Sequence, residues 1–297
     1  MPQGTQDFSL TKKAFAKQTF TEDHIEQISN CMDPITGPAY FMEHFVKIQH
    51  PTKGGIKFEP FEFQERLIHT YSQYRYSINM LPRQTGKTTC AAAYLLWYAM
   101  FVADSTILVA AHKAAGSQEI MQRIRYAYEC IPDHIRAGVS EYNKTSLTFD
   151  NGSRIVSSTT TENTGRGMSL TLVYLDEFAF VPPRIAAEFW TALSPTLSTG
   201  GKCIMTSTPN SDEDTFASIW NQATKTVDEY GNPSVVGVNG FKGYMAKWDQ
   251  HPDRTKEWAE EERSRIGEER FRREHECEFI IYNETLVDPL KLATLKP

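Results

Sequence analysis

Met80-Leu-Pro-Arg-Gln-Thr-Gly-Lys-Thr-Thr89 is the stretch that decides the fold of this 297-residue chain. An apolar run with strand character, Tyr76–Leu81, precedes it, and an Ala/Leu-rich run with helix character, Cys90–Phe101, follows it. A strand, a tight loop with Gly-Lys-Thr and then a helix form the layout of a phosphate-binding loop. The sequence therefore predicts an α/β protein, with a mostly parallel sheet and helices on both faces, that binds a nucleoside phosphate.

The chemistry of such a loop assigns roles to its residues. Backbone N–H groups at a helix N-terminus attract anions, and Gly86 lets phosphate oxygens approach the backbone. Lys87 would reach the β- and γ-phosphates of ATP, and the Thr88 hydroxyl would ligate Mg²⁺. Leu81 stands where the usual motif has its first Gly, so an ordinary turn with a solvated Lys is the alternative. The predicted nucleotide-binding residues of this stretch are Arg83, Gln84, Thr85, Gly86, Lys87, Thr88 and Thr89.

A second site supports the nucleotide interpretation. The apolar run Leu170–Leu175 ends in the adjacent carboxylates Asp176 and Glu177. In ATPases with a phosphate loop, Asp176 would hold Mg²⁺ and Glu177 would polarise the attacking water. Successive strand side chains point to opposite faces, so both carboxylates serve one site only where the strand gives way to a loop. The alternative is that they cap the helix beginning near Pro183.

Further polar residues are candidates for the nucleotide site, and some of them have an equally simple structural role as the alternative. Gln64, upstream of the phosphate loop, can offer a donor and an acceptor to an adenine edge, or lie on the surface of a packing helix. Thr206, Ser207 and Thr208 end a buried strand and can sense a γ-phosphate, or serve as turn residues before a Pro. Arg166 lies in a Gly-flanked loop, Glu162–Ser169, that leads into the second site.

Composition narrows the class of protein. The net charge of −6 argues against a permanent, sequence-blind coat on nucleic acid, but it permits a local basic surface that is used transiently. The five Cys are scattered without paired spacing, which suggests reduced thiols in a cytosol-like compartment. No apolar run reaches the length of a membrane span, and no secretory leader opens the chain.

The pattern of apolar residues and turns predicts four segments. We expect an N-terminal arm and helices over 1–57, an ATPase core over 58–240, a small lid or linker subdomain over 241–281 and a linker over 282–297. Helices are expected over Thr21–Asn30, Tyr40–Ile48, Ala114–Cys130 and Thr215–Ala223, and strands over Thr106–Ala111, Gly243–Trp248 and Cys277–Ile281. Five arginines between Arg263 and Arg273 stand beside many Glu, which favours a salt-bridged helix face over a nucleic-acid site.

Together these residues resemble the large terminase subunit of tailed bacteriophages, especially its T4-like branch. The resemblance covers about Phe58 to Ile281. It rests on motifs that occur in this order: Arg-Gln-x-Gly-Lys-Thr-Thr at 83–89, Ala-His-Lys at 111–113, Arg-Gly at 166–167, Tyr-Leu-Asp-Glu-Phe-Ala-Phe at 174–180, Thr-Ser-Thr-Pro-Asn at 206–210 and Phe-Arg-x-Glu-His at 271–275.

The resemblance implies an ATPase that drives double-stranded DNA into a preformed capsid. It assigns the adenine contact to Gln64 and the coupling of hydrolysis to movement to Thr206, Ser207 and Thr208. Arg83 and Arg166 compete for the role of arginine finger, which is left open. The partners it implies are DNA, the portal protein, the small terminase subunit and further copies of the chain in a ring, by analogy a pentamer, in the host cytoplasm. Family members continue into a nuclease domain, and no nuclease site is expected here.

Two other functions remain as alternatives. A helicase of superfamily 2 shares the Gln, Gly-Lys-Thr and Asp-Glu motifs, but it needs a second RecA-like domain, and the residues after about Gly240 are too few for one. A nucleotide-gated scaffold that binds DNA has no need of a water-polarising acid such as Glu177. A guanine-specific GTPase is disfavoured, because Asn143-Lys144 lacks the following Asp that reads the base.

Overall fold

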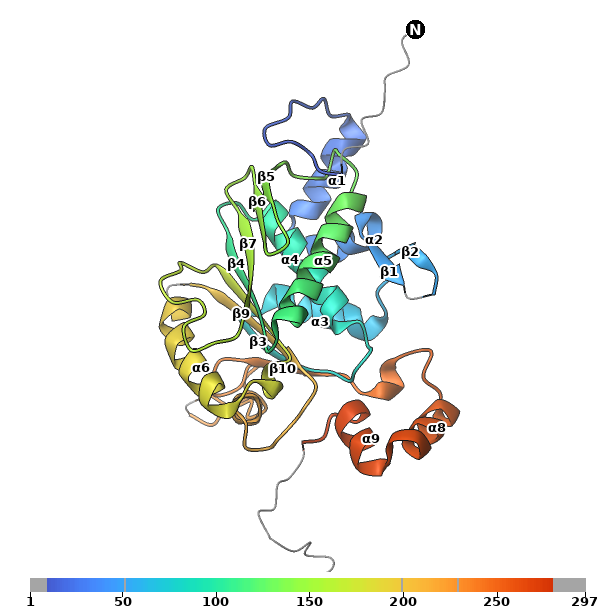
Figure 1. Ribbon diagram of the computed structural model, residues 1–297, viewed down its shortest axis with the longest axis vertical. Coiled ribbons are helices and arrows are strands. Elements are labelled where there is room, and N and C mark those ends of the chain that lie inside the picture. Colours follow the sequence, from blue (N-terminus) through green and yellow to red (C-terminus); the bar gives the residue numbers. More distant parts are fainter. Residues whose placement is uncertain (1–9, 51, 199, 229, 280–297) are drawn as a thin grey trace, which may run out of the picture.

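The computed structural model describes residues 10–50, 52–198, 200–228 and 230–279. Helices and strands alternate from α3 to α5 and again from β8 to β10, apart from a short 3-10 turn after β8 (Figure 1). The α-helices are α1 (Glu22–Met32), α2 (Gly37–Phe45), α3 (Glu62–Gln73), α4 (Lys87–Phe101), α5 (Ala114–Cys130), α6 (Pro183–Ser198), α7 (Thr215–Ala223), α8 (Lys256–Ile266) and α9 (Glu268–His275). The strands are β1 (Lys47–His50), β2 (Gly54–Lys57), β3 (Tyr76–Met80), β4 (Thr106–Ala111), β5 (Val139–Tyr142), β6 (Ser146–Phe149), β7 (Arg154–Thr159), β8 (Leu172–Asp176), β9 (Lys202–Ser207) and β10 (Lys242–Met245).

In the part of the chain that the structure describes, the central sheet has eight strands in the order β10-β3-β9-β8-β4-β7-β6-β5. The run from β10 to β7 is parallel, and the β5–β6–β7 meander adds an antiparallel edge. The central strands β4, β8 and β9 are almost fully buried, as continuous apolar runs of a two-sided sheet should be. The predicted α/β fold is therefore confirmed.

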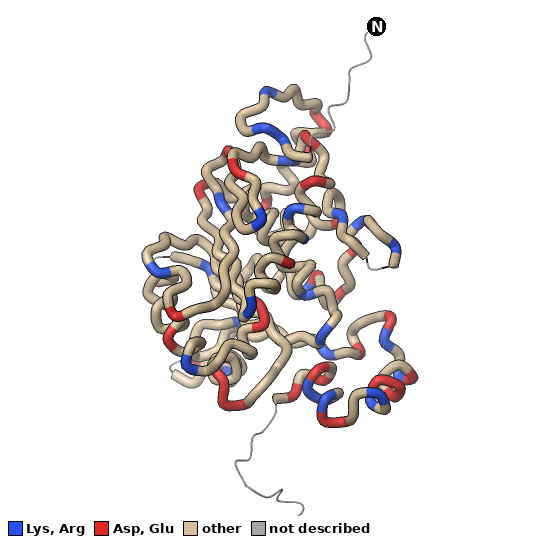
Figure 2. The backbone as a smooth tube through the Cα atoms, viewed as in Figure 1, with Lys and Arg blue, Asp and Glu red and all other residues tan. Residues whose placement is uncertain are grey.

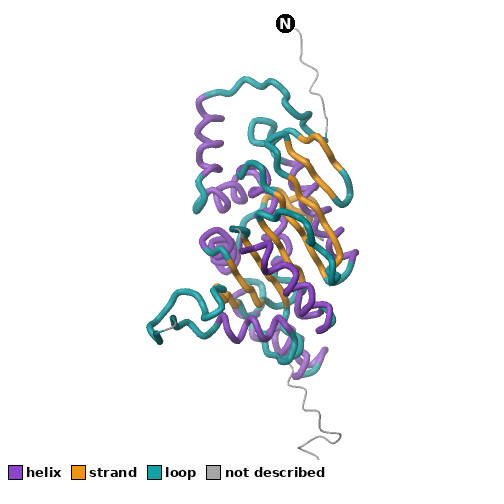
Figure 3. The backbone as a smooth tube through the Cα atoms, turned by 90° about the vertical axis from the view of Figure 1, so that its left-hand side faces the viewer, coloured by secondary structure: helices purple, strands orange, loops and turns teal. Residues whose placement is uncertain are grey.

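Helices cover both faces of this sheet (Figures 1 and 3). On one face, α2, α3, α4 and α5 bury a cluster that includes Phe63, Tyr94 and Ile124. On the other face, α6 and α7 bury a second cluster around Phe189 and Phe216. The last helices, α8 and α9, lie apart from these layers, at the lower right of Figure 1. None of the helices within the described residues is both long and apolar enough to cross a membrane.

Several predicted helices and strands begin or end at the residues expected from the sequence. The bounds of β4, α5 and α7 coincide with the expected ranges. Helix α1 begins after Thr21, whose hydroxyl accepts a hydrogen bond from the His24 backbone N–H at 3.3 Å, as an N-cap should. Four of the five arginines of α8 and α9 are paired with carboxylates as expected, for example Arg263 with Glu276 at 2.6 Å and Arg273 with Glu274 at 3.1 Å.

Three expectations need correction. The helix expected over Tyr40–Ile48 ends at Phe45, and the chain then enters the hairpin of β1 and β2. The core was expected to end at residue 240, but β10 lies beyond it and pairs in parallel with β3, so the sheet extends to Met245. This pairing depends on contacts between residues far apart in sequence, which no local pattern reveals. The division into domains otherwise stays a prediction.

The third correction concerns the strand expected over Cys277–Ile281. Residues 277–279 have no regular structure, and residues 280 and 281 lie outside the described residues, as does the tail 282–297. The cause is local: Cys277 adopts a left-handed backbone with φ 59°, and the Glu278 N–H returns to the Arg272 carbonyl at 3.1 Å. The chain therefore wraps around the end of α9 instead of extending.

Candidate active site

The phosphate loop joins the end of β3 to the start of α4. Two residues of the loop have a positive φ, Gln84 at 58° and Gly86 at 75°, so the chain turns sharply before Lys87 begins the helix. The Thr85 hydroxyl donates to the Pro82 carbonyl at 2.9 Å and fixes the turn from inside. No side chain caps the N-terminus of α4. Its first N–H groups are therefore available to an anion, as a phosphate site requires.

The two carboxylates lie at the same edge of the sheet as this loop. Strand β8 ends at Asp176, and one strand, β9, separates it from β3. Glu177 follows with φ 49° and ψ 44°, a left-handed conformation that is uncommon for a residue other than Gly. Because the strand stops here, Glu177 does not continue the alternation of β8. The expected change from strand to loop between the two acids is therefore present.

Lys87 joins the two parts of the site. Its ammonium lies 2.8 Å from Glu177 Oε1 and donates to Thr208 Oγ1 at 2.9 Å. The other carboxylate oxygen of Glu177 accepts hydrogen bonds from Ser207 Oγ at 3.2 Å and from the Thr208 backbone N–H at 3.1 Å. The Lys87 side chain is 6% exposed and that of Glu177 is 24% exposed. In this arrangement the cation of the phosphate loop is neutralised by the candidate general base.

The two carboxyl groups differ in their affinity for a proton. Burial, followed by repulsion from Glu177, raises the pKa of Asp176 to about 6. Burial also opposes ionisation of Glu177, but the Lys87 charge and the hydrogen bonds from Lys87, Thr208 and Ser207 outweigh it and lower its pKa. The Tyr174 hydroxyl donates to Asp176 Oδ1 at 2.8 Å and orients that carboxylate.

The predicted γ-phosphate sensors divide into two groups. Ser207 and Thr208 contact Glu177, as described above. Thr206 is fully buried and its hydroxyl lies 3.4 Å from the hydroxyl of Tyr71, on α3. The structure thus brings two of the three residues to the Lys87–Glu177 pair and places the third side chain in the core.

Gln64 lies beside the phosphate loop but is largely occupied by backbone partners. Its Nε2 donates to the Thr85 carbonyl at 2.9 Å, and its Oε1 accepts from the Phe61 N–H at 2.9 Å. The side chain is buried, and a Cβ on Gly86 would lie 2.5 Å from Gln64 Nε2. The structure therefore gives Gln64 a support role for the loop, and the adenine contact stays a prediction.

The two candidate arginine fingers occupy different surroundings. Arg83 lies in the phosphate loop, is half-exposed and has its Nε 3.9 Å from Glu274 Oε2 of α9. Arg166 is exposed and borders a hollow together with Ala187 and Thr191 of α6. Within the described residues, no hydrogen bond or ion pair joins Arg166 to Lys87 or Glu177. The structure does not bring these two arginines together.

Sequence reasoning missed contacts that come from distant segments. Arg254, which precedes α8, donates to the carbonyls of Arg83 at 2.7 Å and Gln84 at 3.3 Å. The segment before α8 is therefore hydrogen-bonded to the phosphate loop. Arg123 of α5 donates to the Thr89 hydroxyl at 3.0 Å. Neither residue stands in a recognisable motif. Their positive charge was the only signal in the sequence that could have marked Arg254 and Arg123 as candidates.

The residues present fit a nucleotide with its metal ion. An uncapped helix N-terminus and the Lys87 ammonium suit phosphate oxygens, while the hydroxyl of Thr88, a half-buried residue, and the carboxylate of Asp176 are oxygen ligands of the kind Mg²⁺ prefers. These groups come from β3–α4 and β8, at the carboxyl ends of parallel strands, where open α/β sheets bind ligands.

Comparison with known proteins agrees with this geometry. Residues 78–288 match the family model described as the terminase large subunit, T4likevirus-type, N-terminal. The large terminase subunit of Thermus virus P23-45 is 33% identical over 141 residues, which cover 44% of this chain and 27% of that protein. The chain thus spans about a quarter of the length of the curated relatives that it matches.

Solved structures show the same fold. The large terminase ATPase domain of Thermus phage P74-26 aligns with a TM-score of 0.61 and 24% identity, over 75% of this chain and 95% of that one. The large terminase of a thermophilic bacteriophage, solved in complex with ADP, aligns with a TM-score of 0.57 and 12% identity, over 73% of this chain and 53% of that one. Because the family model covers more than half of the sequence, this chain belongs to the family of T4-type large terminase subunits, in their N-terminal part.

Proposed function

We propose that this chain is the ATPase part of a DNA-packaging motor, which hydrolyses ATP to ADP and phosphate and drives double-stranded DNA into a procapsid. The observation that carries this proposal is the Lys87–Glu177 contact at 2.8 Å, beside the uncapped N-terminus of α4 and next to Asp176. Membership of the terminase family supports the same function and does not favour the helicase or the scaffold alternative.

The geometry suggests how the residues would act in turn. Lys87 would exchange its bond to Glu177 for the phosphates, which carry more negative charge. Glu177 would then lose the main cation that lowers its pKa and become a better acceptor for a proton from the attacking water. Mg²⁺, held by Thr88 and Asp176, would supply neutralisation of the developing phosphate charge. Ser207 and Thr208 would hold the Glu177 carboxylate in place during the exchange.

The partners follow from the family and stand as part of the proposal. They are double-stranded DNA, the portal protein, the small terminase subunit and further copies of the chain in a ring, within the host cytoplasm. The ADP bound to the large terminase of the thermophilic bacteriophage supports an adenine nucleotide as the ligand. Either Arg83 or Arg166 would stabilise the transition-state charge, in the same subunit or in a neighbouring one.

The test is phosphate release by the 297-residue chain with ATP and Mg²⁺, and with EDTA in place of Mg²⁺. We expect hydrolysis that requires the metal, and we expect Lys87→Ala to lose nucleotide affinity in a titration with a fluorescent ATP analogue. Lys225→Ala removes an exposed lysine in a distant loop and serves as the matched control. Normal ATP binding by Lys87→Ala would refute the assignment of the phosphate loop.

A further inference from the structure

The hairpin of β1 and β2 is a basic ribbon outside the central sheet. It projects to the right of α5 in Figure 1, and Lys or Arg residues mark it in Figure 2. The sequence from His44 to Phe58 contains no Asp or Glu, but it contains Lys47, Lys53 and Lys57. All three lysines are exposed. In a chain with a net charge of −6, this is a local excess of positive charge.

The register of the hairpin places like charges opposite each other. Lys47 pairs with Lys57 across the two strands, while Ile48 pairs with Ile56 on the face toward the helices. Like charges that face each other across a strand pair are destabilising. Within the described ranges, none of the three lysine side chains has a hydrogen bond or an ion pair, so no direct partner offsets that repulsion. A bound polyanion would do so.

Two other clusters of basic groups in the described residues are mostly held by internal partners. Four of the five arginines of α8 and α9 have carboxylate partners, such as Arg272 with Glu278. Lys12, in the N-terminal arm, donates to the carbonyls of Asp133 and Arg136, both at 2.9 Å. The hairpin lysines therefore differ from these clusters in being free to meet an external anion.

The ribbon is held in a defined position. His50 Nδ1 accepts hydrogen bonds from the backbone N–H groups of Thr52 at 3.2 Å and Lys53 at 3.3 Å, which orders the turn that carries Lys53. A Cβ on Gly55 would lie 2.3 Å from the Tyr126 hydroxyl, so β2 is seated closely on α5. A preorganised surface loses little conformational freedom when it binds.

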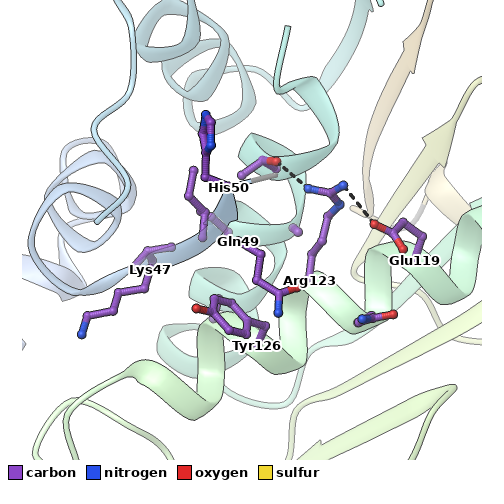
Figure 4. A pocket seen from close by; sticks show the side chains of 13 residues that line it. Lys47, Gln49, His50, Glu119, Arg123 and Tyr126 are labelled. Atoms are coloured by element: carbon purple, nitrogen blue, oxygen red, sulfur yellow. Dashed lines mark hydrogen bonds and ion pairs between the residues drawn. The ribbon is translucent and has the colours of Figure 1, made fainter. Parts of the chain in front are cut away.

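The inner face of the ribbon adjoins the candidate active site. A cavity of about 230 Å³ lies between β1 and the helices α4 and α5, and Lys47, Gln49 and His50 line it on the hairpin side (Figure 4). Across the cavity, Arg123 pairs with Glu119 at 2.9 Å and donates to Thr89 in the first turn of α4. An anion held by Lys47 would therefore lie beside a cavity that reaches the first turns of the phosphate-loop helix.

We propose that the β1–β2 hairpin binds the phosphate backbone of double-stranded DNA through Lys47, Lys53 and Lys57. A two-stranded ribbon matches the width of the duplex major groove, and the spaced lysines match phosphates that flank it. The contact carries no sequence preference, as a translocating motor requires. The choice of DNA as the polyanion rests on the proposed function.

The test is fluorescence anisotropy of a labelled duplex of about 30 bp, titrated with the nucleotide-free chain between about 50 and 200 mM salt. The triple variant Lys47→Gln, Lys53→Gln, Lys57→Gln should weaken binding by about tenfold or more and make the log–log salt slope shallower by about three, roughly one for each lysine. The control Lys144→Gln, Lys225→Gln, Lys256→Gln changes three exposed lysines elsewhere by the same charge and should bind as the wild type does.

A second measurement does not depend on a variant that folds. Acylation of wild-type lysines, read by mass spectrometry, should show protection of the three hairpin lysines by the duplex and none at the control positions. Equal acylation with and without DNA, or a triple variant that binds DNA as the control does, would overturn the proposal. The proposal would also be overturned if the triple variant kept DNA binding but lost self-association, because the hairpin would then contact another copy of the chain and not DNA. ATP hydrolysis without DNA is measured separately. It tests the proposed ATPase function and does not depend on whether the hairpin binds DNA.

Discussion

Replacing Glu177 by Gln tests the exchange of Lys87 between its carboxylate and the nucleotide. The substitution keeps the size of the side chain and one acceptor oxygen, which can serve either Lys87 or the Ser207 and Thr208 donors, but it removes the negative charge that lies 2.8 Å from Lys87. Two effects should follow in opposite directions. Hydrolysis should fall because no general base remains, and ATP binding should tighten because Lys87 no longer has to leave an anion.

The structure sets the size of both effects. Loss of a general base lowers turnover by about 100- to 10,000-fold. The Lys87–Glu177 bond is charge-assisted and mostly buried, so its net contribution is about 1.5–3 kcal/mol. Part of this remains as a neutral hydrogen bond in the Gln variant, which leaves roughly 1.5 kcal/mol, and about 1.4 kcal/mol corresponds to a tenfold change in an equilibrium constant. We therefore expect ATP affinity to rise on the order of tenfold.

The assay combines equilibrium titration with a fluorescent ATP analogue and single-turnover phosphate release. Glu62→Gln is the control, because the Glu62 side chain is 83% exposed and its ion pair among the described residues is with Arg66 on the surface of α3. It should leave both quantities unchanged. Turnover of Glu177→Gln within threefold of the wild type would remove Glu177 as the base, and unchanged affinity would show that Lys87 does not exchange partners.

Three further predictions follow from the site and the fold. Variants Arg83→Ala and Arg166→Ala, each mixed with wild type in steady-state ATPase assays, should show rescue or poisoning for the arginine that acts across subunits; activity strictly proportional to the wild-type fraction for both would exclude a role in trans. Gly86→Ala should lose at least about tenfold in nucleotide affinity and about 1–3 kcal/mol of stability, because φ is +75° there and the new Cβ would meet Gln64; an unchanged melting temperature would contradict this. Burial raises the pKa of Asp214 from 3.8 to about 6, so the unfolded chain gives up this proton first and stability falls as pH rises between those values, by up to about 3 kcal/mol. Asp214→Asn keeps a capping oxygen and should lose this component in urea unfolding at pH 4.5 and 7; an equal pH dependence in both proteins would refute it.

The structure adds a connection between the end of the chain and the phosphate loop. Arg254 donates to two loop carbonyls, and the Arg83 N–H donates to the Glu274 carbonyl at 3.2 Å. These bonds hold a loop in which Gln84 has a left-handed backbone, a conformation that needs support from its surroundings. A movement of α8 and α9 would therefore change the hydrogen bonds that hold the phosphate loop.

The sequence by itself determined the features that are local. The apolar runs of β4 and β9, the Gly-Lys-Thr turn before α4 and the paired acids after β8 are each written in a few consecutive residues, because strand burial, positive φ and helix capping are short-range requirements. Their order along the chain was enough to predict an α/β nucleotide-binding fold. The motifs also predicted that the phosphate loop and the paired acids serve one nucleotide, which agrees with their position at one edge of the parallel sheet.

Only the tertiary structure decided which distant groups became partners. It placed β10 beside β3, occupied Gln64 with the Thr85 carbonyl, sent the Thr206 hydroxyl to Tyr71 and set Lys47 opposite Lys57. The β10–β3 and Tyr71–Thr206 contacts depend on packing across long separations in sequence, and the Gln64 contact and the Lys47–Lys57 register depend on how the chain folds back on itself. Hydrogen bonds and ion pairs act over a few ångströms, so their partners are fixed by the packed fold and not by the neighbouring residues in the chain.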